Sequence, residues 1–314
     1  MKRALLSFLA IVAMAIFLNL LDFLPRRVTA PFLAEAASPE LDVLKVEIEK
    51  LLKDMEAGAV LDKGWAAYRR GNYSTAYREW LPLAKRGNAD AQFYIGAMHD
   101  EGIGVTQDSA EALKWWRLAA VQGNADAQIN LGLKYEKGEG IRQDSAEALK
   151  WFRLAASQGI VRAQLKVAVI FLLGHIVPQD FSEALKWFRR AADQGNAFAQ
   201  FSIGTLYGRG AGVPKDDTQT VKWYRLSADQ GLAEAQYYLG IKYMAGEGAP
   251  QDHVLAHMWL NLAASRLPPG QGRDKAVEGR DLLSRGMTAD QLAEAQRLAR
   301  EWKPKSRSKL KKGE

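Results

Sequence analysis

Apolar and small side chains recur in this chain at the spacing of amphipathic helices. Between residues 124 and 159, Ala127, Leu131 and Tyr135 lie four positions apart, and Gln128 shares their side. This spacing is typical of a helix and differs from the strict alternation of a strand. A second apolar stripe follows in the same segment and consists of Ala148, Trp151, Phe152, Ala155 and Ala156. The pattern predicts one helix over residues 125–137 and a second that ends before residue 159.

Glycine and capping residues mark the ends of these two helices. Gly138 and Gly140 follow the first helix, and glycine readily adopts the left-handed conformation that a helix end needs. Asp144 or Ser145 suits the N-cap of the second helix, and Gly159 ends it. The unit is therefore helix A, loop, helix B and turn.

The same unit returns every 36 residues along the chain. Four columns of identical residues carry this period, and their members are Gln92, Gln128, Gln164, Gln200 and Gln236; Trp115, Trp151, Trp187, Trp223 and Trp259; Gly102, Gly138, Gly174, Gly210 and Gly246; and Ala120, Ala156, Ala192, Ala228 and Ala264. A fixed period of this size indicates stacked helical pairs. The fold class that follows is an all-α solenoid, in which each pair is stabilised by its neighbours.

The repeated columns favour a structural role over a chemical one. Small residues such as Ala127 and Gly132 on helix A allow helix B to approach closely. Large side chains fill the space between repeats, and we assign this role to the Trp column and to the aromatic residues that follow it, Trp116, Phe152, Phe188 and Tyr224. The alternative roles are sugar-stacking platforms for the Trp residues and phosphate-binding loops for the Gly-x-Gly segments. A phosphate loop of the dinucleotide type needs a preceding strand, whereas a helix precedes every Gly pair here.

The repeat reads ADAQ-x-x-LG-x-x-Y-x-x-G-x-G and then D-x-x-x-A-x-x-W-[FWY]-x-x-A-A-x-QG, which resembles the Sel-1-like repeat, a relative of the tetratricopeptide repeat. The resemblance covers residues 90–123, 126–159, 162–195, 198–231 and 234–264, with a degenerate unit at 64–87 and a closing helix at 287–304. It implies a right-handed solenoid that binds proteins or peptides, and it implies no reaction. The cysteine-stapled secreted branch of the family is not matched, because the chain has no Cys.

These patterns predict five regions. Residues 1–36 are a membrane anchor or signal peptide, and 37–61 a linker with an amphipathic capping helix. Residues 62–267 form the solenoid, with a degenerate unit over 62–87 and five repeats over 88–267. Capping helices over 268–302 and a basic, disordered tail over 303–314 complete the chain.

The first region carries the prediction of cellular location. Lys2 and Arg3 precede an apolar run from Ala4 to Leu21, which is close in length to a membrane span. We expect export, with the chain attached to the membrane through residues 4–24 and facing the periplasm. Cleavage near Ala36 would instead release a periplasmic or secreted protein, and a buried core helix is the remaining alternative.

The net charge of +7 is concentrated at the two ends. Residues 303–314 carry +5 and residues 1–30 carry +3, so residues 31–302 carry −1. A nearly neutral solenoid does not indicate a general polyanion-binding surface, and we expect no specific nucleic-acid partner. The tail fits a solvated segment better than a lipid or nucleic-acid contact.

Candidate catalytic chemistry is sparse. His253 and His257 are four residues apart on a predicted helix, which is a possible pair of metal ligands, but no third ligand follows at a convincing spacing. Acid pairs such as Asp144 and Glu147 recur with the repeat and fit helix capping. We therefore expect neither an enzyme nor a cofactor or metal site.

A partner surface is expected where helix A varies between repeats. Positions two, six and nine after the column Gln share a face, which lies on the concave side in tetratricopeptide-like solenoids. The candidate contact residues are Tyr94, Met98, Asn130, Lys134, Lys137, Lys166, Ser202, Leu206, Arg209, Tyr238 and Lys242. Tyr and Lys around the apolar Ile170, Leu173 and Leu206 suit an amphipathic or acidic peptide.

The predicted function is a non-catalytic scaffold or adaptor of the bacterial cell envelope that binds a protein or peptide on this face. The alternative is an envelope protein that binds or processes peptidoglycan or another polysaccharide, with exposed Tyr and Trp stacking on sugar rings.

Overall fold

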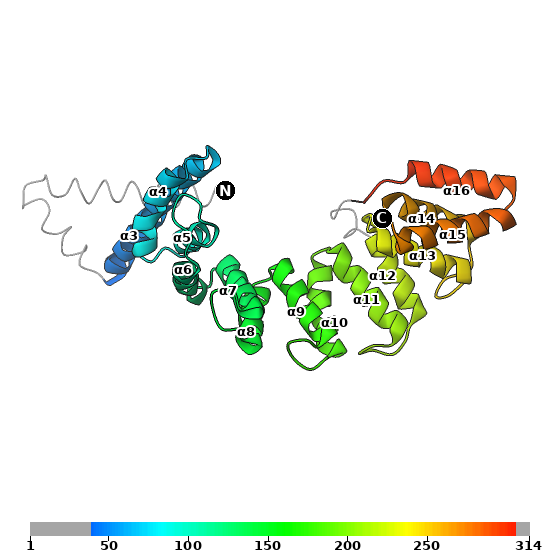
Figure 1. Cartoon of the computed structure of the whole chain (residues 1–314), viewed down its shortest axis with the longest axis horizontal. Helices are drawn as coiled ribbons and strands as arrows, with labels where there is room; N and C mark the ends of the chain where they lie inside the picture. Colours follow the sequence, from blue (N-terminus) through cyan, green and yellow to red (C-terminus); the bar gives the residue numbers. More distant parts are fainter. Residues whose placement is uncertain (1–38, 306–314) are drawn as a thin grey trace, which may run out of the picture. The chain divides into compact units, whose positions relative to one another are not determined.

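The computed structural model describes residues 39–305, and this range contains 14 helices and no strand (Figure 1). The helices occur in repeated pairs, which confirms the predicted all-α solenoid class. The expected N-terminal hydrophobic helix and the end of the basic tail lie outside the described residues. No helix within residues 39–305 combines the length and the apolar composition that crossing a bilayer requires.

The chain divides into two compact units, the first ending at residue 108. In the first unit, each helix packs on the next. Its helices are α3 (Pro39–Arg69), α4 (Tyr73–Lys85) and α5 (Ala89–Glu101).

Helix α3 continues across the boundary that we placed between residues 61 and 62, so the capping helix and the degenerate unit share one helix. Trp80 of α4 packs on α3 at this boundary, and its indole donates a hydrogen bond to the carbonyl of Leu61 at 3.2 Å. Gly64 makes room for the ring, since a Cβ there would lie 2.0 Å from the indole nitrogen.

The second unit begins at residue 109 and contains the other helices. They are α6 (Ser109–Val121), α7 (Ala125–Lys137), α8 (Ser145–Ser157), α9 (Val161–Leu173), α10 (Phe181–Asp193), α11 (Ala197–Arg209), α12 (Asp217–Asp229), α13 (Ala233–Ala245), α14 (His253–Arg266), α15 (Gln271–Gly286) and α16 (Ala289–Glu301). From α6 to α14, each helix packs on the helix that follows it, as expected for a solenoid. Helices α15 and α16 both pack on α14 and close the end of the stack (Figure 1).

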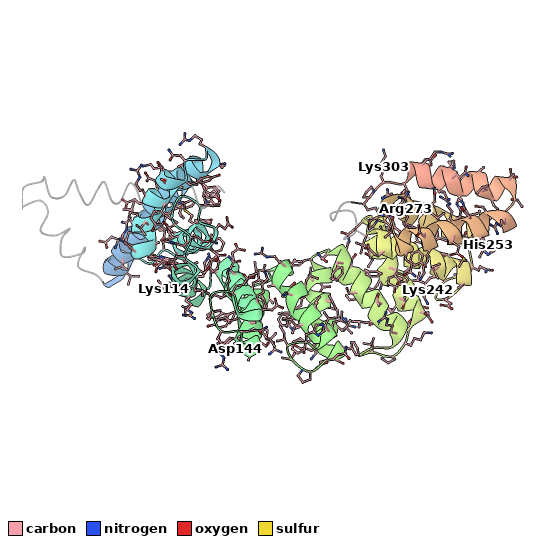
Figure 2. The ribbon with its side chains drawn as sticks, in the orientation of Figure 1. Lys114, Asp144, Lys242, His253, Arg273 and Lys303 are labelled. Carbon is pink, nitrogen blue, oxygen red and sulfur yellow. The ribbon has the colours of Figure 1, made fainter. Side chains whose placement is uncertain are left out.

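Capping residues set the helix boundaries. Asp144 (Figure 2) accepts hydrogen bonds from the backbone N–H groups of Ala146 and Glu147, so the aspartate, and not Ser145, caps α8. Asn124 caps α7 in the same way. Gly138 ends α7 with a φ of 73°, a left-handed conformation that favours glycine.

The Gln column links successive repeats through buried hydrogen bonds. The side-chain N–H of Gln128 donates to the carbonyl of Ala120 at 3.0 Å, at the end of the preceding helix B. Its side-chain oxygen accepts from Gln158 at 2.9 Å, thirty positions later. Gln164 makes the same two bonds, with Ala156 and Gln194. The repeated Gln residues are therefore structural, because each one joins its repeat to the preceding repeat and also joins helix A to the end of helix B within its own repeat.

The large residue after each column Trp is buried against a small residue of helix A. Phe152 packs directly on Gly132, where a Cβ would lie 2.6 Å from the ring. Tyr224 and Gly204 repeat this contact. The column Trp residues themselves vary in burial, because Trp187 and Trp259 are buried and Trp115, Trp151 and Trp223 are only half-buried. The glycine on helix A therefore allows the two helices to approach closely, as the small residues predicted.

Candidate protein-interaction surface

The structure places the predicted contact residues in three different environments. The sixth position after the column Gln faces mainly inward, and Met98 and Leu206 are buried there. Ser202, at the second position, is also buried, and its hydroxyl donates to the carbonyl of Phe198. Variation at these positions reflects alternative core packing, so we remove Met98, Ser202 and Leu206 from the set of accessible contacts.

The other predicted residues are at least partly accessible. The ninth position lies at the end of helix A, and Lys137 and Arg209 are exposed there. At the second position, Asn130 and Lys166 are half-buried and Tyr238 is 45% exposed. The predicted face is therefore a narrow row at the rim of helix A and not a continuous surface.

The lysines of this row are already paired with carboxylates of the chain. Lys134 lies 3.3 Å from Glu139, and Lys166 lies 2.7 Å from Glu136. Lys242 of α13 (Figure 2) forms two ion pairs, with Asp217 and Glu247, both at 2.6 Å. These contacts argue against the acidic peptide that the lysines suggested, because an acidic partner would have to displace an existing carboxylate.

The ion pairs around Lys242 also shift the pKa values of Lys242 and Asp217. Burial opposes the charge of Lys242, but its hydrogen bonds with Asp217 and Glu247 outweigh that effect and raise its pKa. The hydrogen bond from Lys242 lowers the pKa of Asp217. Both groups therefore remain charged at neutral pH, and the pair is kept in its ionised form.

An apolar groove of about 620 Å³ lies along α7, α8 and α9. We use the name "apolar groove" for the site lined by Ile129, Leu133, Phe152, Val161, Arg162, Leu165, Lys166, Val169 and Asn196. Its walls are six apolar side chains, and its rim cations are neutralised, because Arg162 pairs with Asp126 at 2.8 Å and Lys166 pairs with Glu136. The groove can therefore accept apolar side chains from a second molecule.

A smaller site of about 350 Å³ lies between α11 and α13. It contains Arg209, Tyr238 and Lys242 from the predicted set, together with Phe201 and Tyr224. The ring of Tyr238 lies 5.7 Å from Phe201 and 5.8 Å from Tyr224, measured between centroids. Burial raises the pKa of Tyr224 despite its hydrogen bond with Thr205, so this hydroxyl stays protonated.

In the first unit, Tyr94 belongs to an aromatic cluster. Its ring lies 4.8 Å from Trp80 and 4.9 Å from Trp65, and these rings line a cavity of only about 130 Å³ together with Tyr68 and Phe93. Replacing Tyr94 would therefore disturb packing as well as any contact with a partner.

Sequence reasoning missed the first and fifth positions after the column Gln, which line these sites in the first four repeats. The residues at these two positions are Phe93 and Ala97, Ile129 and Leu133, Leu165 and Val169, Phe201 and Thr205, and Tyr237 and Ile241. All except Ile129 are only half-buried. They are as variable as the predicted row, and the apolar or aromatic character of all of them except Thr205 was the available signal of a binding surface.

The structure places the two histidines of the possible metal-ligand pair in different environments. His253 is exposed at the start of α14, whereas His257 is buried and its Nε2 lies 3.1 Å from the hydroxyl of Ser284. Within residues 39–305, no group of three or more potential metal ligands comes together.

Comparisons with known proteins agree with this architecture. The family model described as the Sel1 repeat matches residues 89–124, 125–160, 161–196, 197–232 and 233–266. A search of curated proteins gave no match.

Two solved structures are similar over most of the chain. A Sel1 repeat protein from Oxalobacter formigenes is 32% identical with a TM-score of 0.63, over 72% of this chain and 100% of that one. The protein c5321, a protective antigen of uropathogenic Escherichia coli with an SLR fold, is 30% identical with a TM-score of 0.63, over 82% of this chain. The match spans 56% of the length of c5321. The chain therefore belongs to the Sel1 repeat family, whose members are generally scaffolds for protein–protein interaction.

Proposed function

We propose that this protein is an envelope adaptor that binds an apolar segment of a partner protein in the apolar groove. The observation that supports this proposal is the groove itself, with six apolar side chains around a volume of about 620 Å³. A site of this size and composition gains binding energy by removing apolar surface of a partner from water.

The partner segment that fits best is an amphipathic helix. Its apolar face would contact Leu133, Leu165 and Val169, while its polar edge would meet the Arg162–Asp126 and Lys166–Glu136 pairs at the rim. Because these rim pairs are neutral as units, we expect binding to depend little on salt.

Location in the envelope is the part of the proposal that rests on sequence alone. Its support is the apolar run after Lys2 and Arg3. This location is tested by attaching residues 1–36 to a reporter that is active only after export. A reporter that stays inactive would exclude a location in the envelope.

The polysaccharide alternative has less support in the described residues. All nine Trp residues lie between residues 65 and 302, and each is buried or half-buried, so none offers an open platform for a sugar ring. Tyr238 and Phe198, both 45% exposed, are the more accessible aromatic side chains. Co-sedimentation with purified peptidoglycan would test this alternative directly.

Site-specific photo-crosslinking in cells tests the groove. A photoreactive residue at Leu165, which lines the groove, is compared with one at Leu173, which is on the same helix but is 50% exposed and outside it. We expect one protein to be captured from position 165 and not from position 173. Equal capture from both positions, or none from 165, would reject this surface.

The captured protein is then purified and its affinity measured. Leu165→Asp introduces a charge into the groove and should weaken binding by about tenfold or more. Leu173→Asp is the matched control and should leave the affinity unchanged. Melting temperatures of both variants separate a loss of binding from a loss of folding.

A further inference from the structure

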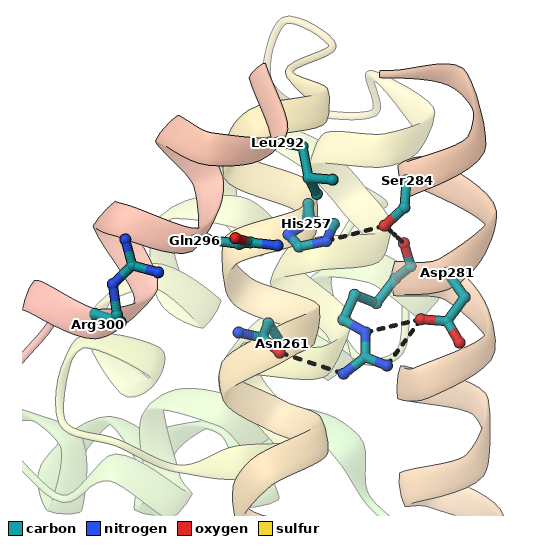
Figure 3. Close-up of a pocket in the computed structure, with 8 residues that line it drawn as sticks. His257, Asn261, Asp281, Ser284, Leu292, Gln296 and Arg300 are labelled. Atoms are coloured by element: carbon teal, nitrogen blue, oxygen red, sulfur yellow. Dashed lines mark hydrogen bonds and ion pairs between the residues drawn. The ribbon is translucent and has the colours of Figure 1, made fainter. Parts of the chain in front are cut away.

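A second site, polar and independent of the apolar groove, lies among the last three helices. Its volume is about 430 Å³, and Figure 3 shows the side chains that line it. We use the name "C-terminal pocket" for the site formed by His257 and Asn261 of α14, Arg280, Asp281 and Ser284 of α15, and Leu292, Gln296 and Arg300 of α16. The three residues of α16 are four positions apart and therefore share one face of that helix.

His257 is the buried polar group of this pocket, with only 3% of its surface exposed. Its Nε2 lies 3.1 Å from the hydroxyl oxygen of Ser284. The single proton of that hydroxyl is already donated to the carbonyl of Arg280, at 3.0 Å. The Nε2–H group of His257 must therefore be the donor to Ser284, which leaves Nδ1 as an unprotonated acceptor.

The Nδ1 atom of His257 is buried and has no hydrogen-bond partner among the described residues. Figure 3 shows the ring between Ser284 on one side and Gln296 on the other. Burial, reinforced by the charge of Arg280 and opposed by Asp281, lowers the pKa of His257, so the ring is neutral at physiological pH. A neutral buried acceptor without a partner is costly, and a ligand that supplies an N–H or O–H group would remove this cost.

The remaining groups of the pocket favour an anion of single charge. Arg280 is held by two hydrogen bonds to Asp281 and one to Asn261, so its charge is largely compensated. Arg300 is exposed and has no side-chain partner within residues 39–305. Two arginines and one aspartate give a formal charge of +1, and guanidinium groups match carboxylates in geometry and charge.

We propose that the C-terminal pocket binds a carboxylate that carries an N–H or O–H donor on the adjacent carbon, with the carboxylate at Arg300 and the donor at Nδ1 of His257. The amide groups of Asn261 and Gln296 supply further donors to the carboxylate. A phosphate meets this arrangement less well, because it carries a larger charge and lacks the adjacent donor. The same chemistry occurs in small N-acyl amino acids and at the free C-terminus of a polypeptide.

Titration of the full chain with N-acetyl-L-alanine tests this proposal, observed through the ¹⁵N resonances of labelled His257. We expect a saturable change in the Nδ1 resonance, because that atom gains a hydrogen bond. N-acetyl-L-alaninamide, which lacks the carboxylate, and acetate, which lacks the adjacent donor, should each bind about tenfold more weakly or worse. Equal affinity for N-acetyl-L-alanine and its amide, or no change at Nδ1, would overturn the proposal.

Arg300→Gln should weaken binding of N-acetyl-L-alanine by about tenfold or more. Its matched control is Arg285→Gln, since Arg285 is an exposed arginine of α15 outside the pocket. Both positions are on the surface, so neither variant should alter the melting temperature. An unchanged affinity in Arg300→Gln would contradict the assigned role of Arg300.

A tetra-alanine peptide with a free or an amidated C-terminus distinguishes the two sources of the ligand. Tighter binding of the free-acid peptide than of N-acetyl-L-alanine would identify a polypeptide C-terminus, and equal binding would identify a small carboxylate. Either result supports the pocket. Binding of the amidated peptide as tightly as the free acid would contradict it.

Discussion

The apolar groove and the C-terminal pocket are built in opposite ways. The groove is formed by positions that recur in every repeat, so Leu165 and Val169 occupy the same places as Ile129 and Leu133. The pocket is formed by residues that occur once, on the second helix of the last repeat, α14, and on α15 and α16, which follow that repeat. A repeating architecture produces similar apolar surfaces at each step, whereas a polar site of specific chemistry occurs where the repetition ends.

The transition between the two regions is visible in the Gln column. Gln128 and Gln164 each accept a hydrogen bond from the Gln that lies thirty positions later. In the last repeat the corresponding residue is Arg266, and the side-chain oxygen of Gln236 is buried without a partner among the described residues. Arg266 lies over the ring of Trp302 instead, 4.6 Å from its centroid. The last repeat thus lacks the bond that joins the column Gln to the end of helix B in its own repeat, and Arg266 contacts Trp302 after α16 in its place.

Replacing Phe152 should have the largest effect, because this residue serves both the core and the groove. Its side chain is fully buried and also lines the groove. We expect Phe152→Ala to destabilise the protein by about 3–5 kcal/mol, measured by urea unfolding. Leu154→Ala, at an exposed position of the same helix, should change stability by less than about 0.5 kcal/mol. A similar loss of stability in both variants would show that Phe152 does not contribute to the core.

Gly132→Ala should have the next largest effect. The new Cβ would lie 2.6 Å from the ring of Phe152, so α7 and α8 would have to separate. Overpacking of this kind costs about 1–3 kcal/mol, which outweighs the better helix propensity of Ala. Thermal unfolding followed by circular dichroism measures the change. Stabilisation would mean that the two helices can move apart without loss of packing. The third repeat has Ala168 at the corresponding position.

Gln158→Ala tests the bond that joins the column Gln128 to the end of helix B in the same repeat. The variant leaves the buried side-chain oxygen of Gln128 without a partner, which reproduces in the second repeat the situation of Gln236. The expected cost is about 1–3 kcal/mol, even though Gln158 itself is exposed. The control is Ser157→Ala at the neighbouring exposed position, which should leave stability nearly unchanged. Stability is measured by urea unfolding. Equal unfolding midpoints for the two variants would contradict the structural role of the Gln column.

These features differ in how far the sequence predicts them. The 36-residue period, the loop glycines and the cap at Asp144 follow from local rules, because each depends on residues close in the chain. The contact residues Met98 and Leu206 were misplaced because variability alone cannot distinguish an exposed position from a core position with alternative packing. The C-terminal pocket was not predictable, because it depends on how α15 and α16 pack on α14. Its residues also do not recur along the chain, so no repeated pattern marks them in the sequence.

Replacing His257 should have the smallest effect on stability, and it tests the C-terminal pocket alone. The pKa of His257 in the folded protein is lowered by burial and by Arg280, against the opposing charge of Asp281. Arg300 of α16 is the other charged residue that lines the same pocket. In the unfolded chain the ring titrates near its ordinary pKa of about 6.5. As the pH falls below that value, the unfolded state gains a proton that the folded state resists, so stability decreases until the folded pKa is reached. We expect His257→Gln to reduce the loss of melting temperature between about pH 7 and about pH 5.5, while His253→Gln, on the exposed side of α14, preserves it. An identical pH dependence in wild type and His257→Gln would mean that the cap does not hold this ring in its neutral form.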